Sequence, residues 1–146
     1  MNGTATAPVR MQAVRRTFRG EPSQVRLVRD FVRRHLGERH DCPEATLEDV
    51  LLCVTETATN AIRHTSSGSG GQFTVVLCLN GSAARVEVID GGPAETPGGG
   101  DDNPREEDDF CLPGGLGLPP LLISHSDRMG YEERGQHGVA WFERMW

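Results

Sequence analysis

The sequence has no closely spaced pair of cysteines, no long apolar run and no lysine. The four cysteines stand far apart, at Cys42, Cys53, Cys78 and Cys111. This spacing argues against a zinc site of the Cys-x-x-Cys type and against a tight disulfide framework. No apolar stretch is long enough to cross a bilayer, and the first 11 residues lack the apolar core of a signal peptide. We therefore expect free thiols, a cytoplasmic location and no membrane partner.

The length sets the number of domains. At 146 residues the chain can bury the core of one domain without disulfides or a structural metal, and it is too short for a second full domain. We expect a disordered leader over residues 1–10 and a single domain over residues 11–146.

Charge is distributed unevenly along the chain. All 15 basic residues are arginine, and nine of them fall in the first 40 positions against three acids. Between residues 94 and 112 the balance reverses, with seven acids against Arg105 alone. The chain as a whole carries a net charge of −6, and its arginine-rich start contains few aromatic residues. These features favour a solvated helix face or a protein-docking surface over direct binding of nucleic acid.

The first half of the chain predicts one strand and two helices. A β-like run spans residues 13–18, and Glu21-Pro22-Ser23 then opens a helix for which Gly37 is the expected stop. A second helix is expected from Pro43-Glu44 to about His64, with Asp41 as a candidate N-cap. Its apolar positions recur at steps of three and four, which is typical of a helix packed on a core.

The second half predicts two strand pairs separated by a loop. Runs 73–79 and 84–90 flank Asn80-Gly81, which favours a hairpin with a type I′ turn. Residues 94–113 are rich in glycine, proline and acids, as in a lid, and a short helix should follow and end near Ser126. Runs 128–133 and 138–144 form the last pair. The order predicts an α+β fold, a two-layer sandwich whose mixed, mostly antiparallel sheet carries helices on one face.

The second helix carries a stripe of polar side chains at Glu56, Asn60 and His64. Steps of four residues place these side chains one above another on a single helix face. A carboxylate can accept a proton, an amide oxygen can ligate Mg²⁺, and an imidazole can donate to an anion. The stripe therefore suits phosphate and metal chemistry, although a simple solvated helix face has the same pattern.

Two glycine-containing motifs accompany the stripe. Asp90-Gly91-Gly92 ends a predicted strand, and Gly114-Gly115-Leu116-Gly117-Leu118 precedes a predicted helix. A carboxylate at a strand end can accept from an exocyclic amine, and backbone N–H groups at a helix N-terminus can bind phosphate. Each motif alone is more often an ordinary turn. Their order and spacing relative to the helix stripe make them specific.

Together these motifs resemble those of the GHKL superfamily of histidine-kinase-type ATPase domains. That superfamily has an E-x-x-x-N helix, a D-x-G-x-G motif and a glycine-rich motif after an ATP lid. The resemblance covers about residues 10–146. The short chain and the order of its elements are most similar to one branch, the bacterial anti-sigma-factor serine/threonine kinases and their actinobacterial relatives.

The resemblance implies a role for each motif residue. Glu56 would be the catalytic base, Asn60 the protein ligand of Mg²⁺, and Asp90 the acceptor for the adenine amine of ATP. The remaining cofactor-binding positions implied are Gly92 beside the base, the backbone of Gly115, Leu116 and Gly117 at the phosphates, and Arg63, His64 and Arg105 as helpers.

The implied function is an ATP-dependent serine/threonine kinase that sequesters a sigma factor and phosphorylates an anti-anti-sigma protein of the STAS type, with a homodimer as one option. The alternative is a degenerate nucleotide-binding interaction module without kinase activity. Ala94 replaces the second motif glycine, and Val139 and Ala140 stand where a threonine is expected, which favours the module. The catalytic half of a two-component histidine kinase is disfavoured, because roughly 40 residues leave no room for a preceding dimerisation helix.

Overall fold

The computed structural model describes residues 12–39, 42–65, 68–91 and 124–146, which form five strands and two helices. The first half contains β1 (Gln12–Arg19), a short 3-10 turn (Pro22–Gln24), α1 (Val25–Arg39) and α2 (Glu44–His64). The second half contains β2 (Gln72–Asn80), β3 (Ala83–Ile89), β4 (Arg128–Arg134) and β5 (His137–Met145).

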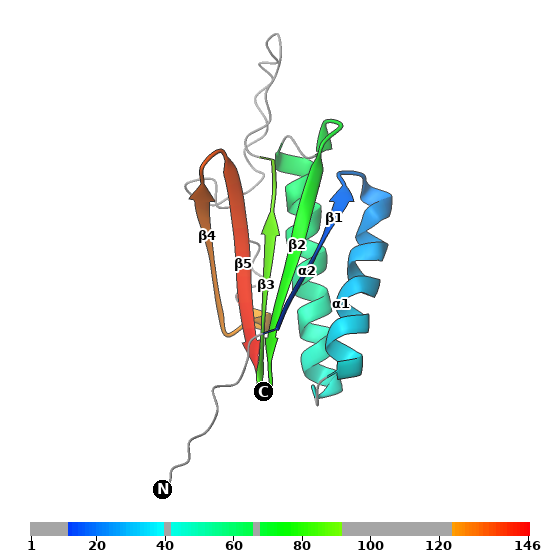
Figure 1. The fold of residues 1–146 in the computed structure, drawn as a ribbon, viewed down its shortest axis with the longest axis vertical. Coiled ribbons are helices and arrows are strands. Elements are labelled where there is room, and N and C mark those ends of the chain that lie inside the picture. Colours follow the sequence, from blue (N-terminus) through cyan, green and yellow to red (C-terminus); the bar gives the residue numbers. More distant parts are fainter. Residues whose placement is uncertain (1–11, 40–41, 66–67, 92–123) are drawn as a thin grey trace, which may run out of the picture.

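The strands form one sheet in the order β1-β2-β3-β5-β4, and every pairing among them is antiparallel. Both helices lie behind the sheet in Figure 1, so one face is covered and the other is open. This arrangement confirms the predicted α+β two-layer sandwich. The expected mixed character of the sheet is not seen in the described strands.

The core lies between the helices and the covered face of the sheet. Strand β2 alternates buried and half-buried residues along its whole length, the period-two pattern of a strand with one face in a core. The rings of Phe18 on β1 and Phe73 on β2 stack with centroids 5.6 Å apart, and Phe31 of α1 meets Phe18 edge-on at 6.0 Å. These three rings join the helix layer to the sheet.

Two local expectations are wrong. Helix α1 continues through Gly37 to Arg39, and a Cβ added at Gly37 would lie 3.5 Å from the Leu47 side chain. Gly37 therefore lies within α1 and does not end it, and a side chain there would make only ordinary van der Waals contact with Leu47. In the β2–β3 hairpin, Asn80 still pairs with Ala83, so the turn consists of Gly81 and Ser82.

The Asn80 side chain explains how this turn closes. Its Oδ1 accepts a hydrogen bond from the Ser82 N–H at 2.8 Å, and the described glycines with positive φ are Gly70 and Gly135, not Gly81. A type I′ turn requires positive φ at its central residues. The side-chain hydrogen bond thus replaces the expected backbone geometry.

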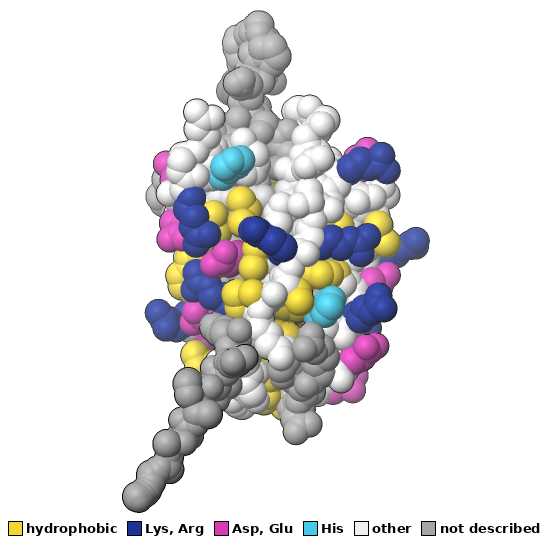
Figure 2. All heavy atoms as spheres, in the orientation of Figure 1, with side chains coloured by type: hydrophobic (Ala, Val, Ile, Leu, Met, Phe, Trp, Pro, Cys, Tyr) yellow, Lys and Arg dark blue, Asp and Glu magenta, His cyan; other side chains and the backbone are white. Residues whose placement is uncertain are grey.

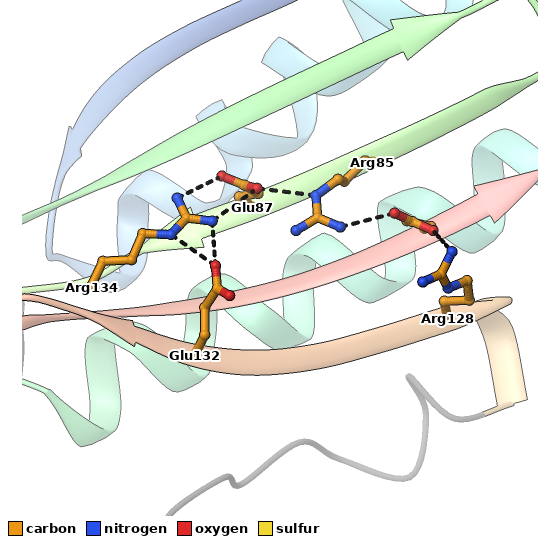
Figure 3. A network of polar contacts seen from close by, with 6 residues as sticks. Arg85, Glu87, Arg128, Glu132 and Arg134 are labelled. Atoms are coloured by element: carbon orange, nitrogen blue, oxygen red, sulfur yellow. Dashed lines mark hydrogen bonds and ion pairs between the residues drawn. The ribbon is translucent and has the colours of Figure 1, made fainter.

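The open face of the sheet carries a chain of ion pairs. Arg134 contacts Glu132 and Glu87, Glu87 also pairs with Arg85 at 3.0 Å, and Arg85 reaches Glu143 at 2.9 Å (Figure 3). Arginine side chains cross this face in a band with apolar side chains between them (Figure 2). Arg85 also lies over the Trp141 ring, with its guanidinium carbon 4.2 Å from the ring centroid.

Neither described helix combines the length and the apolar character that a bilayer-spanning segment needs. The leader, the candidate cap Asp41, the predicted lid and Cys111 lie outside the described residues. Of the short helix predicted to end near Ser126, residues 124–126 are described, and Ser124 and His125 are helical.

Candidate nucleotide site

Asp90 lies directly after β3, at the end of the molecule where α2 ends and where β4 turns into β5 (Figure 1). Its carboxylate is on the covered side of the sheet and only 6% of the residue is exposed. The Gly138 N–H donates to Asp90 Oδ1 at 3.1 Å, and the Asp90 N–H donates to the Gly138 carbonyl at 2.9 Å. His137 Nδ1 is 2.9 Å from the Asp90 carbonyl oxygen. The strand pairing thus fixes a nearly buried carboxylate at a sheet end.

The polar line on α2 is longer than the sequence predicts. Asp49, Cys53, Glu56 and Asn60 follow one another at steps of four, three and four residues, so they share one side of the helix. Arg144 of β5 donates to Asp49 Oδ2 from Nε at 3.2 Å and from a terminal nitrogen at 3.1 Å. The Cys53 thiol lies 3.7 Å from the His125 carbonyl. This side of α2 therefore faces β5 and the segment before β4.

The Asp49–Arg144 ion pair joins α2 to β5, so positions along the helix and along the strand can be compared from this contact. Asn60 lies 11 residues beyond Asp49, a rise of about 16 Å along a helix. Gly138 lies six residues back from Arg144, about 20 Å along a strand. Since α2 contacts β5 and runs roughly along the strands in Figure 1, Asn60 and Asp90 lie at about the same level. Glu56 lies one helical turn below.

The described structure thus places Glu56, Asn60 and Asp90 toward one region. Glu56 and Asn60 are half-buried, whereas Arg63 and His64 are exposed in the last turn of α2. No hydrogen bond or ion pair within the described part of the chain involves the Glu56 carboxylate. The other expected site residues, listed here, lie outside the described residues: Gly92, Arg105, Gly115, Leu116 and Gly117.

Burial and nearby charges on this side of α2 shift the pKa of the Cys53 thiol. Burial raises the pKa of the Cys53 thiol from 9.0 to about 12, and the charges of Asp49 and Glu56 add to the effect while Arg144 opposes it. Glu56 follows Cys53 by three residues on the same side of α2. Cys53 is thus a protonated, buried core residue below the candidate site.

Within the described residues no group of three histidine, cysteine, aspartate or glutamate side chains could hold a metal ion. Mg²⁺ bound with a nucleotide takes few protein ligands and is held largely by phosphates and water, so the expected Mg²⁺ site does not require such a group. Asn60 is the one described residue for which a ligand role is expected.

Sequence reasoning missed Tyr131. A threonine was expected near Gly138, but the strand register places Gly138 itself opposite Asp90. A Cβ added at Gly138 would overlap with the Tyr131 hydroxyl and lie 2.9 Å from Asp90 Oδ2. Tyr131 therefore occupies the space of the missing side chain. Two observations could have drawn attention to Tyr131. It is the chain's single tyrosine, and its strand pairs with the strand that carries Gly138.

An antiparallel sheet with helices on one face defines the class of the chain as an α+β two-layer sandwich, and a nearly buried acid lies at one end of its sheet. The model of the histidine kinase-like ATPase domain matches residues 18–140. The chain belongs to this family, which confirms the predicted resemblance to the GHKL superfamily. None of the curated proteins compared with the chain matches it.

A solved structure shows the same fold. It contains the RsbU and RsbW domains of Rv1364c from Mycobacterium tuberculosis, with a TM-score of 0.65 and 18% identity. The likeness covers 92% of this chain and 32% of that one, so the chain spans about a third of its length.

Proposed function

We propose that the chain is an ATP-dependent serine/threonine kinase of the anti-sigma type, acting in the cytoplasm. It would sequester a sigma factor and transfer a phosphoryl group to a hydroxyl of an anti-anti-sigma partner. The observation that carries the proposal is the nearly buried Asp90 carboxylate, at about the level of Asn60 and one turn above Glu56. Family membership supports ATP as the ligand.

The residues present fit a nucleotide base. A carboxylate that is 6% exposed needs polar partners, and strand pairing supplies the Gly138 N–H to Oδ1. The second oxygen, Oδ2, faces the same side as the half-buried Tyr131 hydroxyl. An acceptor held in this way suits the exocyclic amine of adenine and disfavours guanine, which presents a carbonyl oxygen at the same position.

The chain's own residues would divide the remaining work. Bound Mg-ATP would supply the transferable phosphoryl group and the metal charge that stabilises it. Asn60 would contribute a ligand oxygen to the metal. Glu56, whose carboxylate makes no hydrogen bond or ion pair within the described residues, would orient the attacking hydroxyl and accept its proton.

The proposed partners rest on weaker support. The fold is shared with a chain that includes an RsbW domain, and the arginine-rich start of this chain, with nine arginines in 40 residues, offers a basic surface for a protein. A sigma factor and an anti-anti-sigma protein are the partners that the resemblance implies.

One observation favours the interaction module as a second candidate. Val139 and Ala140 stand where the superfamily motif has a threonine, and Gly138 beside Asp90 provides no side chain, so the base pocket departs from the motif there. A module of this kind would bind the nucleotide and the partner without transferring phosphate.

The test combines ATP titration with phosphate transfer. The purified chain, together with proteins that co-purify with it from its source cell, is incubated with Mg²⁺ and ATP labelled at the γ-phosphate. We expect label on a serine or threonine of a partner, abolished by Glu56→Gln and retained by Glu48→Gln, an exposed glutamate on the same helix. ATP binding without label supports the module, and absence of ATP binding overturns both candidates.

A further inference from the structure

Gly138 and Tyr131 approach each other unusually closely beside Asp90. An ideal Cβ on Gly138 would overlap with the Tyr131 hydroxyl oxygen, and it would lie 2.8 Å from Tyr131 Cζ and 2.9 Å from Asp90 Oδ2. The phenol oxygen and the carboxylate oxygen therefore lie on the same side of Gly138, both close to one point. Only glycine at position 138 leaves room for this arrangement.

Strand register explains why the phenol lies on the covered face. Tyr131 pairs with Ala140 on β5, and Ala140 pairs with Val88 on β3, so the three side chains share one face of the sheet. Val88 is fully buried beneath the helices, and Asp90 is two residues further along the same strand. The small Ala140 and Gly138 leave the tyrosine ring space to extend toward Asp90.

The two side chains have complementary hydrogen-bonding chemistry. An ionised carboxylate can only accept, whereas a phenol can donate. Adenine presents an amine flanked on both sides by ring nitrogens that accept. A carboxylate and a phenol directed to one point match such a pair of neighbouring groups on a base.

We propose that Tyr131 is a specificity-determining residue for the nucleotide base, donating a hydrogen bond to a ring nitrogen next to the amine that Asp90 accepts. This proposal rests on the nucleotide site described under the proposed function and assigns to it a residue that the superfamily motif lacks. No threonine stands near Gly138, and the Tyr131 hydroxyl occupies the space that a side chain at position 138 would take.

The electrostatic surroundings keep the phenol in its donating form. Burial raises the pKa of Tyr131 above its ordinary value of 10.0, and the negative charges of Asp90 and Glu133 raise it further. His137 Nδ1 lies 2.9 Å from the backbone carbonyl oxygen of Asp90. Tyr131 therefore retains its proton at neutral pH and remains a donor.

The test is a double-mutant cycle that combines a substitution in the protein with the removal of a ring nitrogen from the nucleotide base. Isothermal titration measures the affinities of the wild-type chain and of Tyr131→Phe for ATP, 1-deaza-ATP and 7-deaza-ATP, analogues that each lack one flanking ring nitrogen. We expect the wild-type chain to bind one of the two analogues about tenfold more weakly than ATP, the effect of one hydrogen bond. Tyr131→Phe should bind ATP about tenfold more weakly, with no further loss for that analogue.

A matched control removes a hydroxyl from the other face of the sheet. Thr74→Val deletes the Thr17–Thr74 hydrogen bond of 2.8 Å on the open face and should leave all three affinities unchanged. Thermal unfolding of Tyr131→Phe should be close to that of the wild-type chain, since the ring remains.

The outcomes separate this proposal from the proposed function. If the wild-type chain binds ATP in an Asp90-dependent manner while Tyr131→Phe binds ATP equally well, Tyr131 has no role in recognition and the nucleotide site stands. If Tyr131→Phe binds each analogue more weakly by the same factor as it binds ATP, the substitution and the missing ring nitrogen act independently. This result would also overturn the proposal. A wild-type chain that binds no ATP overturns both.

Discussion

Asp90 and Gly138 are hydrogen-bonded to each other twice, once through the two backbones and once through the Asp90 carboxylate. The Gly138 N–H donates to Asp90 Oδ1 at 3.1 Å, and this hydrogen bond fixes the orientation of the Asp90 side chain. A carboxylate positioned in this way loses little conformational entropy when a ligand binds. The pairing of β3 with β5 therefore preorganises the candidate site.

Removing this carboxylate should weaken nucleotide binding. We expect Asp90→Ala to lose about 1.5 to 3 kcal/mol of ATP affinity, because it deletes the charged acceptor for the adenine amine. Isothermal titration of ATP into both proteins gives the difference. Asp30→Ala, which removes an exposed carboxylate paired with Arg33 on α1, is the control and should bind ATP as the wild-type chain does. Equal affinities for Asp90→Ala and wild type would exclude Asp90 from the site.

Substitutions of Glu56 and Asn60 should affect different steps, phosphoryl transfer and Mg²⁺-dependent ATP binding respectively. Glu56→Ala should leave ATP binding nearly intact while it lowers phosphoryl transfer about 100-fold or more, because a positioned base acts on the attacking hydroxyl. Asn60→Ala should weaken the Mg²⁺-dependent part of ATP binding, because it removes a metal ligand. Titrations with and without Mg²⁺, beside transfer rates, distinguish the two. If both variants lose only binding, the assignment of Glu56 as the base is wrong.

Cys53 should be the least reactive of the described thiols. Its pKa of about 12 and its complete burial leave almost no thiolate at pH 8, whereas Cys42 and Cys78 are only half-buried. Labelling the folded protein with an aromatic disulfide should give the same number of fast-reacting thiols in the wild-type chain and in Cys53→Ala. Cys78→Ala should lose one of them. A fast thiol that disappears in Cys53→Ala would contradict the buried placement.

Tyr131 should make the folded state less stable in strong base. Its folded pKa is raised above 10.0, so its contribution is fully present below about pH 10 and is lost as the pH rises through the raised value. Denaturant unfolding at increasing pH should show a smaller loss for Tyr131→Phe than for the wild-type chain. The single tyrosine also allows a direct absorbance titration. Its midpoint should fall, but not reach 10.0, in Asp90→Asn, because burial is the larger cause.

Gly130 should tolerate no side chain on the open face. A Cβ there would lie 2.7 to 2.8 Å from three ring atoms of Trp141, so Gly130→Ala should displace the ring that Arg85 covers. We expect a loss of about 1 to 3 kcal/mol in unfolding free energy, as for other overpacked sites. Gly81→Ala, where a Cβ meets nothing within 4 Å, should change stability by less than about 0.5 kcal/mol. Comparable losses in both variants would rule out the Trp141 contact as the cause.

Periodicity in the sequence was sufficient for the regular elements. Strand β2 alternates without interruption and α2 keeps its three-and-four spacing from Val50 to Ala61, so local pattern and tertiary burial agree there. Turns and helix ends were less predictable. Asn80 hydrogen-bonds through its side chain where the sequence predicts a type I′ backbone turn, and α1 continues through Gly37 to Arg39 where the sequence predicts its end.

The candidate site is likewise predictable from the sequence only in part. Glu56 and Asn60 are readable because they recur on one helix face, and Asp90 because it ends a strand. Tyr131 is not readable from local pattern, since its place beside Asp90 depends on two strand registers and on the absence of a side chain at Gly138. Residues brought together only by pairing across a sheet have no signature in a sequence window.

The double hydrogen bond between Asp90 and Gly138 joins residues that are 48 positions apart. A ribosome at work on this chain releases α2 and β3 well before the strand that holds the Asp90 carboxylate. The nascent protein can therefore pack α1 against α2 while the Asp90 carboxylate still lacks the hydrogen bond that fixes its orientation. At the proposed site, nucleotide binding would therefore have to follow the emergence of β5 from the ribosomal exit tunnel.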